Sequence, residues 1–400
     1  MFIKIKRLSD DVRRVITTVM LGKTGHALFS FLLCISVTSN SNAELPVPAG
    51  GTYTGAGGVP NTNWVTSGQA DASVTGNALT INQASERATL EWNSFNITAN
   101  SSVTFNQPGS TSVAINRINQ ADPSRIFGAI DANGQVYLIN QNGFLFGSSF
   151  RVNTNTFIAS TLDITQEALD RGLGHAVDVR RAAFEGNNQF MEDANGNPVM
   201  FAVDPQGKIM RRADDSPVTL TDAVTDGLVD ANATGRALPL VRIVIERGAE
   251  FTTAGKGVGR IMIFAPEIIN HGNISTPDGQ TILAASNRVY LSEDTELRGL
   301  LVELDIGGAI TNGDEATNAT VSDPAQLVGQ ILTERGNTTL AALAINQNGR
   351  VSATTAVQQG GSIRLIARDQ ANYQSLDNRA VLPEANQSGY VNFGNGSRTE

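Results

Sequence analysis

Residues Gln135–Ile164 read QVYLINQNGFLFGSSFRVNTNTFIASTLDI. The stretch holds three short apolar runs, Val136–Ile139, Phe144–Phe146 and Phe150–Val152. Turn-forming residues separate the runs, first Asn140-Gln141-Asn142-Gly143 and then Gly147-Ser148-Ser149. Because Asn and Gly tolerate positive φ angles, each cluster can turn the chain sharply. Taken alone, Asn142-Gly143 favours a β-hairpin, but the flanking sequence favours a larger repeat.

Short strand-like segments recur on both sides of this stretch. On the N-terminal side they contain β-branched or aromatic residues and end in turn formers; they are Ala78–Ile81, Ala88–Trp92, Phe95–Ile97, Ser102–Phe105 and Ser112–Asn116. On the C-terminal side, Ile261–Ala265 and Thr281–Ala285 are equivalent segments twenty residues apart. A period near twenty residues, with several short strands in each period, predicts the stacked coils of a parallel β-helix. A β-sandwich or a propeller accounts less well for this pattern.

Stacked coils place equivalent side chains in columns along the axis. In Ile261-Met262-Ile263-Phe264, alternation predicts that Ile261 and Ile263 share one face. Asn residues at repeated turns are predicted to form a ladder of amides, each bonded to its copy one coil away.

The first 43 residues are expected to be an extended signal peptide. Residues 1–23 carry six Lys and Arg side chains, and an eleven-residue apolar run follows at Ala27–Val37. That run is too short to span a bilayer and fits the core of a signal peptide. The small residues Ser41 and Ala43 predict cleavage between Ala43 and Glu44. An N-terminal membrane anchor is the alternative.

Removal of the signal peptide leaves an acidic chain without cysteine. The full chain has 29 Lys and Arg and 38 Asp and Glu, of which residues 1–43 hold 6 and 2, so the mature net charge is −13. We therefore expect no nucleic-acid partner and no membrane insertion of the mature chain. Because Cys34 is the only cysteine, burial and backbone hydrogen bonds must hold the mature fold together.

Residues 165–240 depart from the strand repeat and predict a mixed excursion. Gln166–Arg171 predicts one or two helical turns, and Val177–Phe190 predicts a short helix. Val199–Val203, which turn sequences flank, predicts a hairpin.

The expected organisation is therefore a signal peptide at 1–43, a β-helical domain at 44–290 that contains the excursion, and further β-helix repeats with an irregular C-terminal end at 291–400.

Five blocks of the sequence resemble a known family in their order and spacing. They are Phe95–Pro108, Ala114–Ile118, Asp122–Gly128, Gly134–Gly147 and Phe157–Ile164. Together they resemble the N-terminal secretion domain of filamentous-haemagglutinin-type exoproteins of bacterial two-partner secretion, across Glu44–Asn287. The resemblance implies an all-β, right-handed parallel β-helix.

The resemblance also implies a route of export. The chain would reach the periplasm by the general secretory pathway. An outer-membrane transporter barrel with periplasmic POTRA domains would then recognise it. The protein is thus expected to be secreted, or held at the surface of a Gram-negative bacterium.

The secretion signature of that family, Asn-Pro-Asn-Gly-Ile, stands here as Asn140-Gln141-Asn142-Gly143-Phe144. Proline would fix φ at the second position, and Gln141 leaves it free. The resemblance makes these five residues, with Phe95 and Asn96 of the first block, the candidate site of transporter recognition. A structural turn that closes a coil is the alternative for the Asn-x-Asn-Gly corner, and core packing is the alternative for Phe95.

Catalysis is not expected, and neither is a metal or a cofactor. Six Asp residues in the excursion are interpreted as a solvated acidic loop: Asp204, Asp214, Asp215, Asp222, Asp226 and Asp230. His175 and His271 lie far apart, and neither has Cys or His neighbours at the spacing of metal ligands.

We expect an adhesin or a surface filament protein, with host glycans or receptors as its partners. The alternatives are a β-helical carbohydrate-active enzyme and the translocation or stalk part of a longer toxin or haem-acquisition exoprotein.

Overall fold

The structure is a computed structural model, and it describes residues 44–50, 64–173, 182–186, 199–202, 210, 212, 218–230, 232–233, 236–237, 241–253, 255, 258–294, 299–354, 361–372, 375–376, 379–380 and 384–400. These residues belong to one compact unit, Asn42–Glu400. The expected signal peptide lies outside the described residues. In the described part of the chain, the structure has no helix of the length and apolarity that a membrane span requires.

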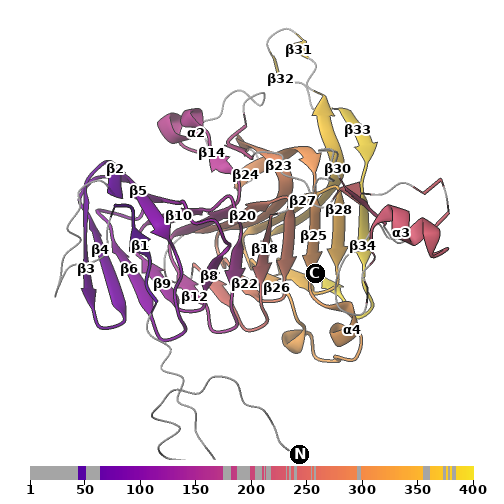
Figure 1. The fold of residues 1–400 in the computed structure, drawn as a ribbon, viewed down its shortest axis with the longest axis horizontal. Coiled ribbons are helices and arrows are strands. Elements are labelled where there is room, and N and C mark those ends of the chain that lie inside the picture. The colour runs from indigo at the N-terminus through magenta and orange to yellow at the C-terminus, as the bar shows by residue number, and fades with distance from the viewer. Residues whose placement is uncertain are drawn as a thin grey trace, which may run out of the picture. The chain divides into compact units, whose positions relative to one another are not determined.

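Three sheets of stacked strands form the sides of a β-helix (Figure 1). The main path of the first sheet runs β1 (Val47–Pro48), β5 (Arg87–Ser94), β7 (Val113–Ile118), β10 (Gln135–Ile139), β13 (Thr156–Ser160), β20 (Arg260–Ala265), β23 (Gln280–Asp294), β27 (Asn337–Ala342), β30 (Ser362–Asn372) and β33 (Glu384–Ser388). The second sheet runs β34 (Tyr390–Phe393), β28 (Ala344–Gln347), β25 (Ala309–Asn312), β21 (Glu267–Asn270), β18 (Arg242–Ile245), β11 (Phe144–Phe146) and β8 (Ser124–Ile126). The third sheet runs β3 (Ala70–Thr75), β4 (Ala78–Gln83), β6 (Ser102–Asn106), β9 (Ala129–Ala132), β12 (Arg151–Asn153), β19 (Glu250–Thr252), β22 (Asn273–Ser275), β26 (Gln330–Leu332), β29 (Arg350–Ser352) and β35 (Arg398–Thr399).

Each coil contributes one strand to each sheet in turn. β10 lies in the first sheet, β11 in the second and β12 in the third, and β13 returns to the first sheet in parallel with β10. Gln135 pairs with Thr156, and Arg260 pairs with Gln280, so a coil takes about twenty residues. The parallel β-helix and its period are confirmed. The opening stretch is one coil and the start of the next, and it is not a hairpin.

Inward-facing side chains form one apolar core between the three sheets. Its centre is a cluster of aromatic rings with centroids 4.8–6.4 Å apart, made by Phe144, Phe146, Phe150, Phe157 and Phe251. Each such side chain, when fully buried, contributes roughly 1.5–3 kcal/mol to stability. The opening stretch supplies four of these five rings, so its apolar runs fill the core of the coils that they build.

The outer face of the first sheet is buried as well, which strand alternation did not predict. β23 extends past the coil and pairs antiparallel with β24 (Gly299–Gly307). β15 (Phe184–Glu185) pairs with β23 and with β14 (Asp163–Ile164). Side chains of these strands form a second apolar cluster with the outward residues of the first sheet.

The segment Ile261–Phe264 shows the consequence of this cover. Ile261 and Ile263 point into the main core, as predicted, while Met262 and Phe264 belong to the second cluster. The ring of Phe184 packs on Phe264 at a centroid distance of 4.7 Å. A strand that is buried on both faces has a continuous run of apolar residues in its sequence. This explains why Ile261–Phe264 is apolar at every position.

Amide side chains stack where strands of the second sheet end. Asn270 Nδ2 donates to Asn312 Oδ1, and Asn312 Nδ2 donates to Gln347 Oε1, each over 2.7 Å. The three residues share one register position and are buried. The predicted amide ladder is confirmed, at a different corner from that of Asn140.

Antiparallel strands close the N-terminal end of the β-helix. β1 and β2 (Val65–Ser67) pair with β5, and β3 pairs with β4. They cover strand edges that would otherwise be open to pairing with other chains. The expectation of a strand at Phe95–Ile97 is wrong, because only Ile97 forms a bridge, with Ile126.

The first part of the excursion contains the predicted helix. α2 spans Gln166–Arg171, and the Thr165 side chain caps it by accepting a hydrogen bond from Ala168 N. The expectation of a helix at Val177–Phe190 is wrong at Phe184, which lies in β15; residues 174–181 and 187–190 lie outside the described residues.

The second part of the excursion differs from the prediction. β16 (Met200–Phe201) pairs with β17 (Arg236–Ala237), so its strand partner is distant in sequence and not the other arm of a local hairpin. A short helix that was not predicted, α3 (Leu220–Thr225), lies between them in sequence.

The C-terminal residues rejoin the β-helix instead of forming the expected irregular end. A small pair, β31 (Ser375–Leu376) and β32 (Arg379–Ala380), precedes β33. β34 then adds to the second sheet and β35 to the third. No domain boundary appears at residue 290, because β23 crosses it. α4 (Glu315–Asn318) and η2 (Pro324–Gln326) lie between β25 and β26 in sequence.

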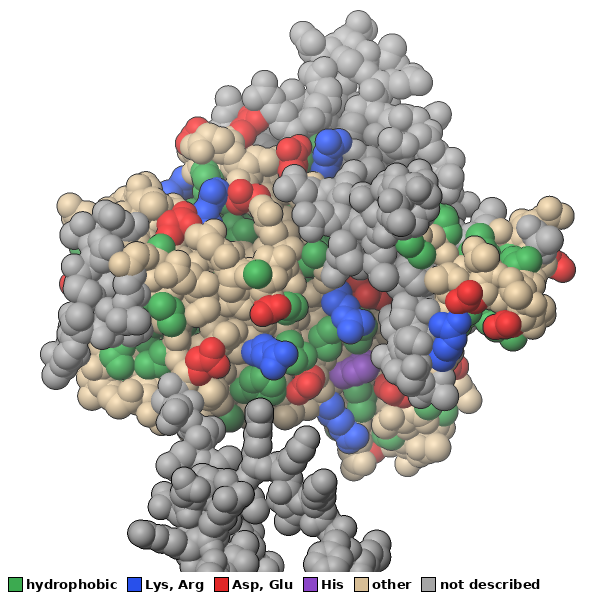
Figure 2. All heavy atoms as spheres, viewed as in Figure 1, with side chains coloured by type: hydrophobic (Ala, Val, Ile, Leu, Met, Phe, Trp, Pro, Cys, Tyr) green, Lys and Arg blue, Asp and Glu red, His purple; other side chains and the backbone are tan. Residues whose placement is uncertain are grey.

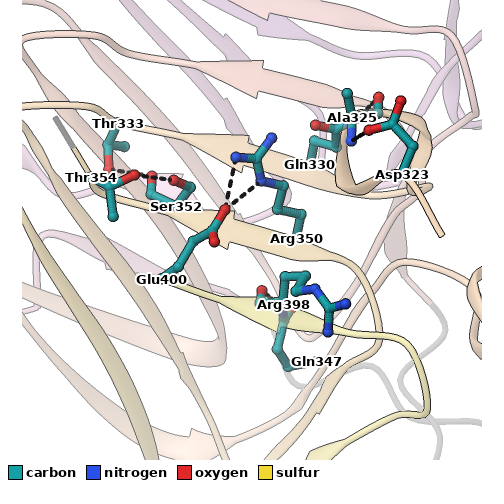
Figure 3. Close-up of polar contacts among 10 residues, drawn as sticks. All are labelled: Asp323, Ala325, Gln330, Thr333, Gln347, Arg350, Ser352, Thr354, Arg398 and Glu400. Carbon is teal, nitrogen blue, oxygen red and sulfur yellow. Dashed lines mark hydrogen bonds and ion pairs between the residues drawn. The ribbon is translucent and has the colours of Figure 1, made fainter. Parts of the chain in front are cut away.

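Figure 3 shows the polar contacts that fasten the last strand. Arg350 of β29 reaches Glu400, with 2.8 Å between Nη2 and Oε1, and Gln347 Nε2 donates to the Arg398 carbonyl over 3.1 Å. Register within the last coil is thus fixed by side chains as well as by the backbone.

Candidate functional site

The Asn140–Gly143 corner joins β10 of the first sheet to β11 of the second. Gly143 N donates to the Asn140 carbonyl over 3.0 Å, which closes a four-residue turn. Asn142 N donates to Asn140 Oδ1 over 2.9 Å, so the side chain of Asn140 holds the same turn a second time. This Asx-type bond requires Asn or Asp at the first position of the corner, where the family signature also has Asn.

Both the backbone conformation and the lack of room for a side chain require glycine at position 143. Its φ is +103°, and a Cβ atom there would lie 2.6 Å from the carbonyl oxygen of Arg242 in the next strand of the sheet. A side chain at this position would therefore both strain the backbone and push β18 away.

Both Asn side chains of the corner bond to the preceding coil. Asn140 is fully buried, and its Nδ2 donates to Ser124 Oγ over 2.9 Å. Asn142 Nδ2 donates to the Gln120 carbonyl over 2.7 Å. The amide of Asn140 is thus used inside the fold, while the Gln141 side chain is exposed.

Phe144 belongs to the core. It is buried and stacks on Phe146, with 5.6 Å between ring centroids and 7° between ring planes. Phe144 stands where the family signature has Ile, and its ring packs within the aromatic cluster.

The structure places Phe95 and Asn96 two coils before the corner and links them to it through the coil between. Phe95 is fully buried, with its ring edge-on to Trp92 at 5.3 Å. Its N–H donates to Gln120 Oε1 over 2.8 Å, and the carbonyl of the same Gln120 accepts from Asn142. Asn96 Oδ1 accepts from Arg125 N over 2.8 Å.

The segment Gln120–Arg125 therefore connects the two groups of candidate residues, and sequence reasoning missed it. Gln120 bonds to both groups, and Ser124 bonds to Asn140 through Oγ and to the Gly143 carbonyl through N. The local sequence carries no signal of this role, because the partners of Gln120 and Ser124 lie in neighbouring coils.

At the expected cleavage site, Ala43 lies outside the described residues and Glu44 is bonded to the first coils. Glu44 N donates to Thr98 Oγ1 over 3.1 Å, and Asn96 Nδ2 donates to Glu44 Oε1 over 2.8 Å. Asn96 thus holds Glu44 on one side and β8 on the other.

A pocket opens beside the corner. Uncharged residues from five segments line it: Gln141, Asn142, Thr161, Leu162, Gly186, Val241 and Pro266. Of the five signature residues, Asn140, Gly143 and Phe144 are buried. Gln141 and Asn142 present a small polar surface.

In the described part of the chain, the structure has no cluster of three or more His, Cys, Asp or Glu residues that could hold a metal ion. Of the acidic residues in the excursion, Asp222 pairs with Arg212 at 2.8 Å, and this hydrogen bond lowers the pKa of the Asp222 carboxyl. Burial lowers the pKa of His271, against a smaller opposing effect of Asp314. On the face drawn in Figure 2, acidic and basic side chains are interspersed and form no patch of a single sign.

Comparison with known proteins finds a family model and relatives that match part of the chain. The family model described as the TPS secretion domain, for two-partner secretion, matches residues 56–201. A heme/hemopexin-binding protein of Haemophilus influenzae is 32% identical over 204 residues, which are 51% of this chain and 21% of that protein. A second heme/hemopexin-binding protein from the same species is 38% identical over 90 residues, 22% of this chain and 10% of that protein.

A solved structure has the same fold. The crystal structure of the HMW1 secretion domain from Haemophilus influenzae superposes with a TM-score of 0.52 at 24% identity, over 76% of this chain and 62% of that one. The chain spans about a fifth of the length of the first curated relative that it matches. Residues 56–201 thus match the TPS secretion domain of two-partner secretion, and the chain shares the fold of the HMW1 secretion domain.

Proposed function

We propose that residues 44–290 direct export of this exoprotein across the outer membrane. After removal of the signal peptide at 1–43, they engage a cognate transporter barrel with POTRA domains in the periplasm. They then fold into the β-helix on the outside of the cell. The match to the TPS secretion domain supports this route.

The Asn140–Phe144 corner acts, in this proposal, mainly as a folding element. The observation that carries it is the complete burial of Asn140. Among the described residues, its side-chain amide bonds to Asn142 N, Ser124 Oγ and the Asp122 carbonyl, and its own carbonyl accepts from Gly143 N. A group so enclosed is available to a partner only before the domain folds. Direct contact with the transporter after folding is left to Gln141 and to the half-buried Asn142.

Closing this corner brings the next aromatic side chains into the core. The coil that follows it buries Phe144, Phe146 and Phe150. At roughly 1.5–3 kcal/mol for each side chain, their burial outside the cell opposes return of the chain through the barrel. Folding of successive coils would thus favour export.

Export and stability measured side by side test the corner. We would express the full chain with its cognate transporter and compare secretion of Asn140→Ala, Asn142→Ala and Gln141→Ala with the unfolding free energy of each purified protein. A folding role predicts that secretion falls in the same order as stability, with Asn140→Ala worst and Gln141→Ala unchanged. Loss of secretion in Gln141→Ala at unchanged stability would instead assign the corner to recognition.

At the cell surface we propose a binding role, as an adhesin or surface filament protein directed at host glycans or receptors, without catalysis. A haem-acquisition exoprotein is the second candidate, because both curated relatives are heme/hemopexin-binding proteins. Titration of the purified chain with haemin, followed in the Soret band, and capture on immobilised hemopexin test the second candidate. Binding to host epithelial cells that persists without haem or hemopexin supports the first.

A further inference from the structure

Part of the cover over the first sheet comes from a strand late in the sequence. β24 lies beside β23 on the outside of the β-helix (Figure 1), and its residues Leu300, Val302 and Leu304 are 4%, 2% and 3% exposed. They belong to the second apolar cluster, together with Met262 and Phe264 of β20. Without β24, part of this cluster would be open to solvent.

One side-chain amide fastens the start of β24. Gln280 is 4% exposed; its Nε2 donates to the Leu300 carbonyl and its Oε1 accepts from Leu300 N, each over 2.8 Å. The amide thus bonds both main-chain groups of Leu300, as a neighbouring strand would do. Gly299 leaves room for it, because a Cβ atom at that position would lie 2.7 Å from Gln280 Oε1. From there β24 pairs antiparallel with β23 as far as Gly307.

Undocking of β24 would open two complementary surfaces. Both β23, beyond the coil, and β24 would present unpaired N–H and C=O groups, which are a template for pairing with another chain. Apolar side chains that face each other across the pair, such as Leu291 and Val302, would be exposed with them. Because β24 already matches β23 in register and in apolar pattern, the best partner for an open β23 is the β24 of a second copy. Such an exchange of identical elements is domain swapping.

We propose that Gln280 is a positioning residue that docks β24 onto its own β23, and that this docking keeps a second copy of the chain from pairing there. The proposal goes beyond the export role and does not depend on it. Loss of both bonds to Leu300 should make opening of β24 about twenty-five-fold more frequent, at about fivefold for each neutral hydrogen bond.

Hydrogen exchange on the purified chain measures this opening. In Gln280→Leu, the amides of β24 should exchange about twenty-five-fold faster than in wild type, while those of β10 keep their rate. Gln330→Leu is the matched control, because Gln330 is also buried and its Nε2 donates to two carbonyls, those of Ala325 and Leu327, in the third sheet and the loop before it. Wild-type exchange of β24 in Gln280→Leu, or an equal increase in Gln330→Leu, overturns the role of Gln280.

A cysteine pair identifies what occupies an open β23. Ser292 of β23 pairs with Leu301 of β24, and neither belongs to the apolar cluster. Cys34 lies in the expected signal peptide, so Ser292→Cys with Leu301→Cys supplies the only thiols of the secreted chain. After incubation at high protein concentration and oxidation, we expect a bond within one chain in the otherwise wild-type protein and covalent dimers in the Gln280→Leu protein.

Two outcomes overturn the second copy as the occupant. One is faster exchange of β24 in Gln280→Leu without covalent dimers, and the other is an equal yield of covalent dimers with and without Gln280→Leu. If Gln280→Leu does not fold, Gly299→Ala, which crowds Gln280 Oε1, carries the same expectations.

Discussion

Replacement of Asn140 by alanine tests whether the corner is held as strongly as its geometry indicates. The substitution removes two hydrogen bonds of 2.9 Å, one from Asn142 N and one to Ser124 Oγ. A third contact, of 3.4 Å to the Asp122 carbonyl, is too long to contribute much. At about 1 kcal/mol for each good bond, plus about 1 kcal/mol for leaving the buried Ser124 hydroxyl without a partner, the unfolding free energy should fall by about 3 kcal/mol.

Urea unfolding of the purified chain, followed by circular dichroism, measures this change. Asn142→Ala is the graded comparison: it removes one bond of 2.7 Å from a half-buried side chain and should cost about 1 kcal/mol. Gln141→Ala is the control, and because the side chain is exposed its effect should stay within about 0.5 kcal/mol. An Asn140→Ala protein within 1 kcal/mol of wild type would refute the reasoning, because the corner would then not be what holds this coil.

Three further substitutions probe the corner, the core and the pH response. Gln141→Pro restores the proline of the family signature and should raise the unfolding free energy by about 0.4–1 kcal/mol. The reason is that Gln141 has a negative φ and its N–H makes no hydrogen bond among the described residues. A lower urea midpoint would contradict this. Phe146→Ala should cost about 3–5 kcal/mol because it empties the centre of the aromatic cluster, whereas Phe393→Ala, at a side chain 55% exposed, should cost little. His271 has a folded pKa below its unfolded value, so its contribution is complete above the unfolded pKa, near 6.5, and is lost as the pH falls from there through the lower folded pKa. The urea midpoint of wild type should therefore fall more between pH 7.5 and 5.5 than that of His271→Asn, and parallel curves would show that His271 plays no part.

Much of the coil can be read from the local sequence. Val136–Ile139, Phe144–Phe146 and Phe150–Val152 became strands or core positions, because an apolar run between turn formers has few other ways to be buried. The Asn-x-Asn-Gly corner is equally local. Its two closing bonds join residues within three positions of each other, so neither needs the rest of the fold.

Features that depend on distant pairing were not predictable in the same way. Phe184 was expected in a helix and lies in a strand, because its partner Val289 is supplied by a part of the chain more than 100 residues away. Gln120 shows nothing of its role in sequence, since its two partners, Phe95 and Asn142, lie in neighbouring coils.

The sequence by itself therefore determined the period, the short strands and the position of the corner, because these follow from side-chain alternation and turn chemistry over a few residues. Only the tertiary structure decided that the outer face of the first sheet is covered, that β34 and β35 rejoin the β-helix, and that Asn140 is enclosed while Gln141 stays exposed. The physical reason is that burial and register are properties of stacked coils, and a coil is buried only by its neighbours.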